Sequence, residues 1–162
     1  MKKSPIRPTD DDARALARDL MQGANHAALG VIHPDSGVPF VSRIALALAP
    51  DSTPMTLIST LAFHTSALQQ NPNCSLLIGT APDKGDPLAF PRLTLSARAE
   101  FIAKDKDDPL RTHYQTINPK SKLYLGFSDF GFVLFHPTSA ALNGGFGKAY
   151  TLTPEDLIPP AA

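Results

Sequence analysis

Residues 92–101 have the sequence Arg-Leu-Thr-Leu-Ser-Ala-Arg-Ala-Glu-Phe, in which polar and apolar side chains alternate. A period of two is typical of a strand with one face in a core and the other in solvent. Shorter apolar runs lie at 27–32, 40–48, 55–59, 75–78, 130–135 and 140–142. Sixteen prolines and ten glycines divide the chain into short segments, which favours strands over long helices. The sequence therefore predicts six or seven short strands.

A few helices accompany these strands. Thr9 is the expected cap of the first helix, three aspartates follow it in the first turn, and Gly23 closes it. A short helix over 63–70 ends before Pro72, and 109–115 and 120–125 favour two more. We expect a single mainly β domain over residues 1–162 with residues 1–8 flexible, folded as a closed antiparallel barrel with helical covers.

The composition argues against several classes of function. Fifteen basic residues balance fifteen acidic ones, which predicts no nucleic-acid partner. The single cysteine, Cys74, lies in an apolar run and is expected to be a buried hydrophobe, and the five histidines lie in unrelated segments, so we expect no metal site. No stretch approaches the ~20 apolar residues that cross a bilayer. The basic start has no apolar signal-peptide core, so we expect no membrane partner and a cytoplasmic location.

Three strand ends carry the residues that suggest chemistry. Arg43 lies in the second strand beside Ser42, the segment 59–65 joins the third strand to the short helix, and Arg92 begins the fifth strand. If the barrel brings them together, two guanidinium groups, hydroxyls and free helix amides would suit a phosphate dianion. The alternative is that both arginines are surface residues and that the hydroxyls only cap a helix. The spacing alone leaves both interpretations open.

Six segments together resemble a known family. They are Gly37–Arg43, Ile58–Thr65, Asn71–Leu77, Pro91–Ala99, Ser128–Phe132 and Gly144–Ala149. Their order and spacing resemble the FMN-binding split barrel of the pyridoxamine 5′-phosphate oxidase-like superfamily, closest to its haem-utilisation branch. The resemblance implies a six-stranded antiparallel split β-barrel, mainly β with small helices. It also implies a homodimer with FMN in a groove at the subunit interface.

The same resemblance implies a set of cofactor-binding residues. Arg43 matches the arginine that meets the FMN phosphate, and Ser59 and Thr60 match strand-end residues beside the flavin. His64 and Thr65 lie where relatives place a basic residue and a hydroxyl against the phosphate. Arg92 matches a cofactor contact from the fifth strand, and the loop 144–147 would lie near the flavin edge.

The first functional hypothesis is an FMN-dependent oxidoreductase whose substrate and catalytic residues are unassigned. The alternatives are a non-catalytic FMN- or haem-binding protein linked to haem utilisation, and an interaction module with a vacant groove. The chain has no tryptophan, and no histidine follows His136. Relatives that oxidise pyridoxamine phosphate use a C-terminal tryptophan, and those that degrade haem use a C-terminal histidine. We therefore expect neither activity.

Overall fold

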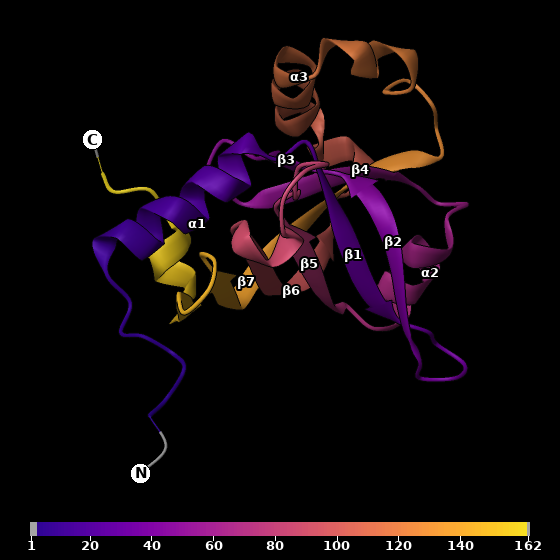
Figure 1. Ribbon diagram of the computed structural model, residues 1–162. Helices are drawn as coiled ribbons and strands as arrows, with labels where there is room; N and C mark the ends of the chain where they lie inside the picture. The colour runs from indigo at the N-terminus through magenta and orange to yellow at the C-terminus, as the bar shows by residue number, and fades with distance from the viewer. Residues whose placement is uncertain (1–2, 162) are drawn as a thin grey trace.

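The computed structural model describes residues 3–161, which form one curled antiparallel sheet with helices at its rim (Figure 1). The sheet order is β2-β1-β5-β6-β7-β4-β3, with β8 paired to β7. The strands are β1 His26–Ile32, β2 Pro39–Ala45, β3 Ala47–Leu48, β4 Pro54–Ser59, β5 Asn73–Ile78, β6 Arg92–Phe101, β7 Phe130–Asn143 and β8 Ala149–Leu152. The predicted mainly β, antiparallel split barrel is confirmed. The strands β2 and β3 end the sheet path at opposite edges, although only Leu46 separates them in the chain.

The structure has eight strands over residues 3–161, where the sequence predicts six or seven. The run 40–48 is divided at Leu46 into β2, which pairs with β1, and β3, which pairs with β4. The two runs predicted at 130–135 and 140–142 form one strand, β7. Pro137 lies opposite Ala97 where the register shifts, and a bulge accommodates a residue that cannot donate to the ladder. The strand β8, which was not predicted, pairs with the end of β7.

The helices are α1 Asp11–Gly23, α2 Phe63–Gln70 and α3 Asp108–Ile117. Short 3₁₀ turns follow at η1 Pro87–Ala89, η2 Lys104–Lys106, η3 Pro119–Leu123 and η4 Pro154–Leu157, so the helix predicted at 120–125 is 3₁₀ rather than α. Asp10, not Thr9, caps α1, because its carboxylate accepts from the Ala13 N–H at 2.8 Å. The Thr9 hydroxyl instead donates to the Thr151 carbonyl at 2.8 Å.

The core has two parts. The larger lies inside the curled sheet and includes Leu29, Leu76, Leu95 and Phe135, with Ala17 of α1 packed against it. The smaller lies under α3 around Met55, Tyr114 and Phe132. Cys74 belongs to the larger core, and burial raises its thiol pKa to about 11. The prediction of a buried cysteine is confirmed.

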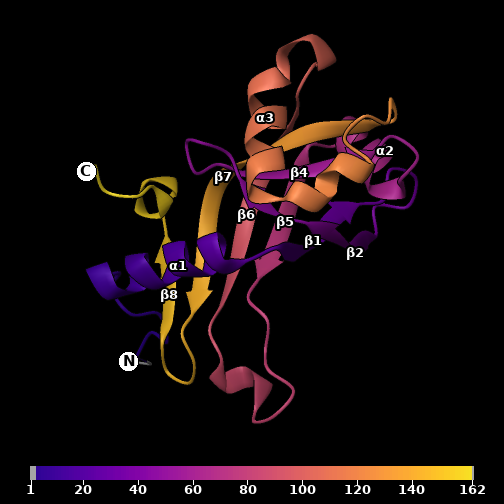
Figure 2. The same cartoon turned by 90° about the horizontal axis from the view of Figure 1, so that it is seen from above.

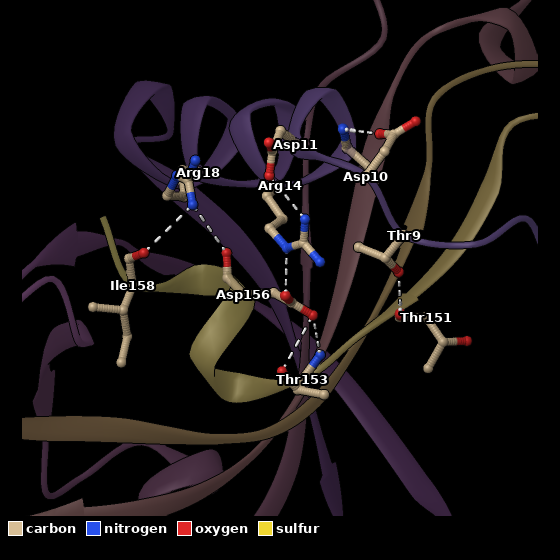
Figure 3. Close-up of polar contacts among 10 residues, drawn as sticks. Thr9, Asp10, Asp11, Arg14, Arg18, Thr151, Thr153, Asp156 and Ile158 are labelled. Carbon is tan, nitrogen blue, oxygen red and sulfur yellow. Dashed lines mark hydrogen bonds and ion pairs between the residues drawn. The ribbon is translucent and has the colours of Figure 1, made fainter. Parts of the chain in front are cut away.

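Polar contacts fasten α1 to the end of the chain (Figure 3). Arg14 donates through Nε to Asp156 at 2.6 Å and through Nη1 to Asp11 at 2.9 Å, and the Arg14 guanidinium lowers the pKa of the Asp156 carboxyl. In the segment before α1, Ile6 forms a parallel bridge with Ala149, and the Arg7 N–H donates to the Ala149 carbonyl at 2.8 Å. Of the segment 1–8 predicted to be flexible, residues 1 and 2 lie outside the described residues.

Candidate functional site

The start of α2 lies directly after β4 and is not capped by a side chain. Ala62 occupies the N-cap position, and an alanine side chain has no oxygen to accept a hydrogen bond. The backbone N–H groups of Phe63 and His64 fall in the first turn, where no carbonyl of the helix itself is available. Such a helix start attracts an anion, because its free N–H groups and the helix dipole both favour negative charge.

Polar side chains gather around this helix start. The Ser42 hydroxyl lies 3.1 Å from His64 Nδ1, and the Thr65 hydroxyl donates to the Ser59 carbonyl at 2.6 Å. Ser59 Oγ donates to Asp129 Oδ2 at 2.7 Å and accepts from the Leu61 N–H at 3.1 Å. Three of the sequence-predicted residues, Ser59, His64 and Thr65, therefore lie together. Thr60 follows Ser59 directly and is exposed, and its N–H donates to the Asp129 carbonyl at 2.7 Å.

His64 has one ring nitrogen without a partner. Its Nε2 is buried and has no hydrogen-bond partner among residues 3–161, while Nδ1 faces Ser42. Burial lowers the imidazole pKa below 6.5, so the neutral ring is favoured. A buried polar atom without a partner costs about 1–3 kcal/mol. A ligand that hydrogen-bonds at this nitrogen would recover that cost.

The two arginines do not join this cluster within one chain. Phe40 and Ser42 of β2 both contact α2, Phe40 through Phe63 with ring centroids 4.7 Å apart. Arg43 lies between Ser42 and Ile44, so its side chain leaves the opposite face of the strand, where it is exposed and lines a cleft.

Arg92 lies still farther from the cluster. It pairs with Asn143 at one end of β7, whereas Ser59 pairs with Phe130 at the other end. Its guanidinium donates to the carbonyls of Leu88 at 3.0 Å and Phe90 at 3.2 Å. The cofactor contacts expected of Arg43 and Arg92 stay predictions.

Sequence reasoning assigned no role to Asp129. It lies in the segment Ser128–Phe132 that carries part of the resemblance, but 70 residues separate it from Ser59, its hydrogen-bond partner. Only the pairing of Ser59 with Phe130 brings the two together.

The contact of Ser42 with His64 could not be read from the sequence either. Ser42 and Arg43 are adjacent in β2, and only the Ser42 side chain leaves the face of the strand that His64 contacts.

The glycine-rich loop 144–147 connects β7 to β8 at the Arg92 end of the sheet. Gly145 has φ +116°, and a Cβ at this position would lie 2.9 Å from the Ala89 carbonyl oxygen. The loop therefore packs closely on the β5–β6 connection, and the two extend side by side (Figure 2). Its expected place near a flavin edge stays a prediction.

Within the part of the chain that the structure describes, no group of three or more His, Cys, Asp or Glu side chains could hold a metal ion. None of the helices over residues 3–161 is long and apolar enough to span a bilayer.

Comparison with known proteins gives relatives over most of the chain. The chloroplastic heme oxygenase HOZ of Arabidopsis thaliana is 32% identical over 114 residues, which are 70% of this chain and 34% of that protein. A heme binding protein from Mycobacterium smegmatis is 26% identical with a TM-score of 0.80, covering 94% of this chain and 61% of that one.

A pyridoxinephosphate oxidase family protein from Clostridium acetobutylicum is similar in fold, with a TM-score of 0.68 and 15% identity over 92% of this chain and 99% of that one. The chain thus spans about a third of the Arabidopsis protein and 61% of the mycobacterial one. The CREG beta-barrel family matches residues 8–158. The chain therefore belongs to the CREG beta-barrel family, within the FMN-binding split-barrel superfamily.

Proposed function

We propose that the protein is an FMN-dependent oxidoreductase that acts as a cytoplasmic homodimer on a small-molecule substrate. The observation that carries this proposal is the uncapped start of α2 beside Thr60 and the unpartnered Nε2 of His64. The comparisons support the fold and leave the ligand open, because the named relatives include heme-binding proteins.

The FMN phosphate would bind where donors are free. The first-turn N–H groups of α2 and the exposed Thr60 hydroxyl can both donate to a phosphate oxygen. Ser59 is a weaker donor to a ligand, because its proton is directed to Asp129. The Asp129 carboxylate also repels a dianion, so a cation is needed nearby. Arg43 is our candidate, because the resemblance assigns it to the phosphate and its exposed side chain forms no ion pair among residues 3–161.

A second copy of the chain would pack on the outer face of the sheet. Val41, Gly30, Ser75 and Ser96 form one cross-strand row on this face. A second row contains Arg43, Ala28 and Leu77. Most of these side chains are small and uncharged, while Val41 is 65% and Leu77 is 47% exposed. A face of mostly small, uncharged side chains with exposed apolar residues suits contact with a second copy of the chain.

FMN, when bound, would supply the electron and hydride transfer chemistry. The chain itself would contribute phosphate anchoring, through the α2 amides, and a groove that the second copy helps to close. The His64 ring, whose pKa is lowered by burial, would act as a neutral hydrogen-bonding group there.

Anaerobic reduction tests the oxidoreductase proposal. Purified dimer loaded with FMN is mixed with NADH or NADPH, and the visible flavin absorbance is followed. We expect the bound flavin to bleach and to recover its absorbance when oxygen is admitted. A bound flavin that dithionite reduces, but that stays oxidised with NADH and with NADPH, would instead indicate a carrier.

Haem binding is the second candidate, favoured by the 32% identity to a heme oxygenase. Haemin titration followed at the Soret band tests it. Saturable haemin binding by a protein that binds no FMN would replace the flavin proposal. The expectation from the resemblance is that residues 1–162 do not degrade haem. Haemin that is consumed in the presence of a reductant would contradict this expectation.

A further inference from the structure

Three large apolar side chains are left exposed at one rim of the sheet. Leu61, in the turn between β4 and α2, is 86% exposed, Leu123 at the end of η3 is 79% exposed, and Phe127, shortly before β7, is 54% exposed. We call these three side chains the rim cluster. Single exposed leucines are ordinary, but several that gather on one face mark a contact surface.

Contacts around Phe130 hold two members of the rim cluster together. The ring centroid of Phe127 lies 6.1 Å from that of Phe130, and the ring centroid of Tyr124 lies 5.5 Å from it. Leu123 directly precedes Tyr124, and the Phe127 N–H donates to the Tyr124 carbonyl at 3.0 Å. Leu123 and Phe127 therefore lie on adjoining turns of one segment.

Leu61 reaches the same rim from the turn before α2. The Thr60 N–H donates to the Asp129 carbonyl at 2.7 Å, and Leu61 follows Thr60 directly. The Leu61 N–H donates to Ser59 Oγ at 3.1 Å, which holds this turn in place. The segment from η3 to β7 runs beside the turn between β4 and α2 in both views (Figures 1 and 2).

Basic side chains border the rim cluster. Lys120 and Lys122 are exposed on η3, and the range 117–128 contains no Asp or Glu. On either side of this range, Asp108 lies at the far end of α3, and the Asp129 carboxylate accepts from a hydroxyl of β4 at 2.7 Å. A chain with no net charge therefore carries local positive charge beside exposed apolar side chains.

The form of this surface favours a fluid partner over a structured one. None of the three apolar side chains lines the cleft of about 990 Å³ between α1 and α3, and all three lie on short turns. A protein partner is held by side chains that fill matching pockets, whereas leucine and phenylalanine on a protruding turn can enter a lipid headgroup layer without a pocket. Lysines beside them would stay at the headgroup level, where anionic lipids attract them.

We infer that the rim cluster docks on an anionic lipid surface, with its apolar side chains in the headgroup layer and with Lys120 and Lys122 facing the anionic headgroups. The sequence led us to expect no membrane partner because no stretch is long enough to span a bilayer, but a surface contact needs no such stretch. This contact does not depend on bound FMN, since none of the predicted FMN-binding residues belongs to the rim cluster.

Cosedimentation with sucrose-loaded vesicles tests the inference. Wild-type protein should bind vesicles of phosphatidylcholine with about one-third phosphatidylglycerol at least about tenfold more tightly than vesicles of phosphatidylcholine alone. Raising the salt from about 0.1 M to about 0.5 M should weaken this binding, because the Debye length shortens. Leu123→Ser and Phe127→Ser should each weaken it about tenfold. The double variant Lys120→Glu, Lys122→Glu should remove the preference for anionic vesicles.

Control variants at the opposite end of β7 match these changes. Phe146→Ser removes a phenylalanine that is 68% exposed in the loop between β7 and β8. The double variant Lys84→Glu, Lys148→Glu changes the net charge as much as the double variant on η3 does. Both controls should bind anionic vesicles as wild type does. Circular dichroism checks the fold of every variant, and Leu123→Ser keeps the test valid if Phe127→Ser misfolds, because Leu123 is the more exposed of the two.

Three results would overturn the inference: no binding to the anionic vesicles, equal binding to both kinds of vesicle, or equal losses in the rim and control variants. A sedimentation coefficient that Leu123→Ser lowers would assign this face to a second copy of the chain instead. All variants should bind FMN with wild-type affinity, so a failure of the FMN proposal is seen separately.

Discussion

Arg43 is exposed on edge strand β2 and has no hydrogen-bonded partner within residues 3–161. If it anchors the FMN phosphate, Arg43→Ala removes charge-assisted hydrogen bonds of about 1.5–3 kcal/mol, or roughly ten- to a hundredfold in the dissociation constant. Arg43→Lys should recover only part of the loss, since an ammonium keeps the charge but not the planar fork. Fluorescence titration with FMN measures both variants.

Riboflavin is the control for the Arg43 prediction, because it has the ring without the phosphate. It should bind equally well to wild type and to Arg43→Ala. Equal losses for riboflavin and FMN would mean that Arg43 supports the ring or the fold instead of the phosphate.

His64 gives a prediction for pH. Burial lowers the pKa of the folded-state His64 below its ordinary value. The unfolded chain therefore binds more protons than the folded chain as the pH falls through that ordinary value. The free energy of unfolding should therefore decrease with falling pH in that window. His64→Gln should reduce the difference in unfolding free energy between about pH 7.5 and about pH 5.5, measured by urea denaturation. An unchanged His64→Gln profile would rule out this role.

Individual residues also show where sequence reasoning reached its limit. Ser59, His64 and Thr65 lie within seven residues, so their grouping could be predicted from the chain alone. Ser42 and Arg43 were grouped because they are adjacent, yet neighbours in a strand point to opposite faces. The contact of Ser59 with Asp129 depends on strand pairing across 70 residues, which no local pattern reveals.

At the scale of elements, local signals predicted most segments. The helix over 63–70 was predicted with the bounds that α2 has, because Pro72 disfavours helix just before it. The strand β7 was predicted as two pieces because Pro137 interrupts the pattern, and the bulge opposite Ala97 keeps it continuous. The strand β8 has four residues and a weak pattern, so its pairing with β7 decides its structure.

The β7–β8 loop offers a test of element packing. Gly145→Ala would add a Cβ at φ +116° and 2.9 Å from the Ala89 carbonyl oxygen. Such strain costs about 1–3 kcal/mol of unfolding free energy, which urea denaturation can measure. Gly126→Ala is the control, since a Cβ there would meet no atom within 4 Å. Similar losses in both variants would show that the close approach to Ala89 is unimportant.

At the scale of the whole molecule, the outer sheet face predicts self-association. Val41→Glu and Leu77→Glu place carboxylates on that face and should shift sedimentation from dimer toward monomer at micromolar concentration. Both side chains are exposed, so the folded chain should tolerate the changes. Leu123→Glu alters an exposed leucine elsewhere and should stay dimeric. A monomeric wild type that still binds FMN would contradict the interfacial groove.

The fold of the whole chain could be predicted because short, proline-separated strands leave few architectures, and the ordered segments of the resemblance narrowed them further. The position of Arg92 could not be predicted in the same way. Ser59 pairs with Phe130 at the start of β7, and Arg92 pairs with Asn143 at its end. The 14-residue length of β7 therefore separates the two residues.

The most direct test is a titration of the wild-type protein with FMN and with riboflavin, followed by flavin fluorescence. We expect saturable FMN binding that is at least about tenfold tighter than riboflavin binding, because the phosphate engages the α2 amides and Arg43. No saturable FMN binding at micromolar concentration, or equal affinity for the two flavins, would contradict an FMN site at the start of α2.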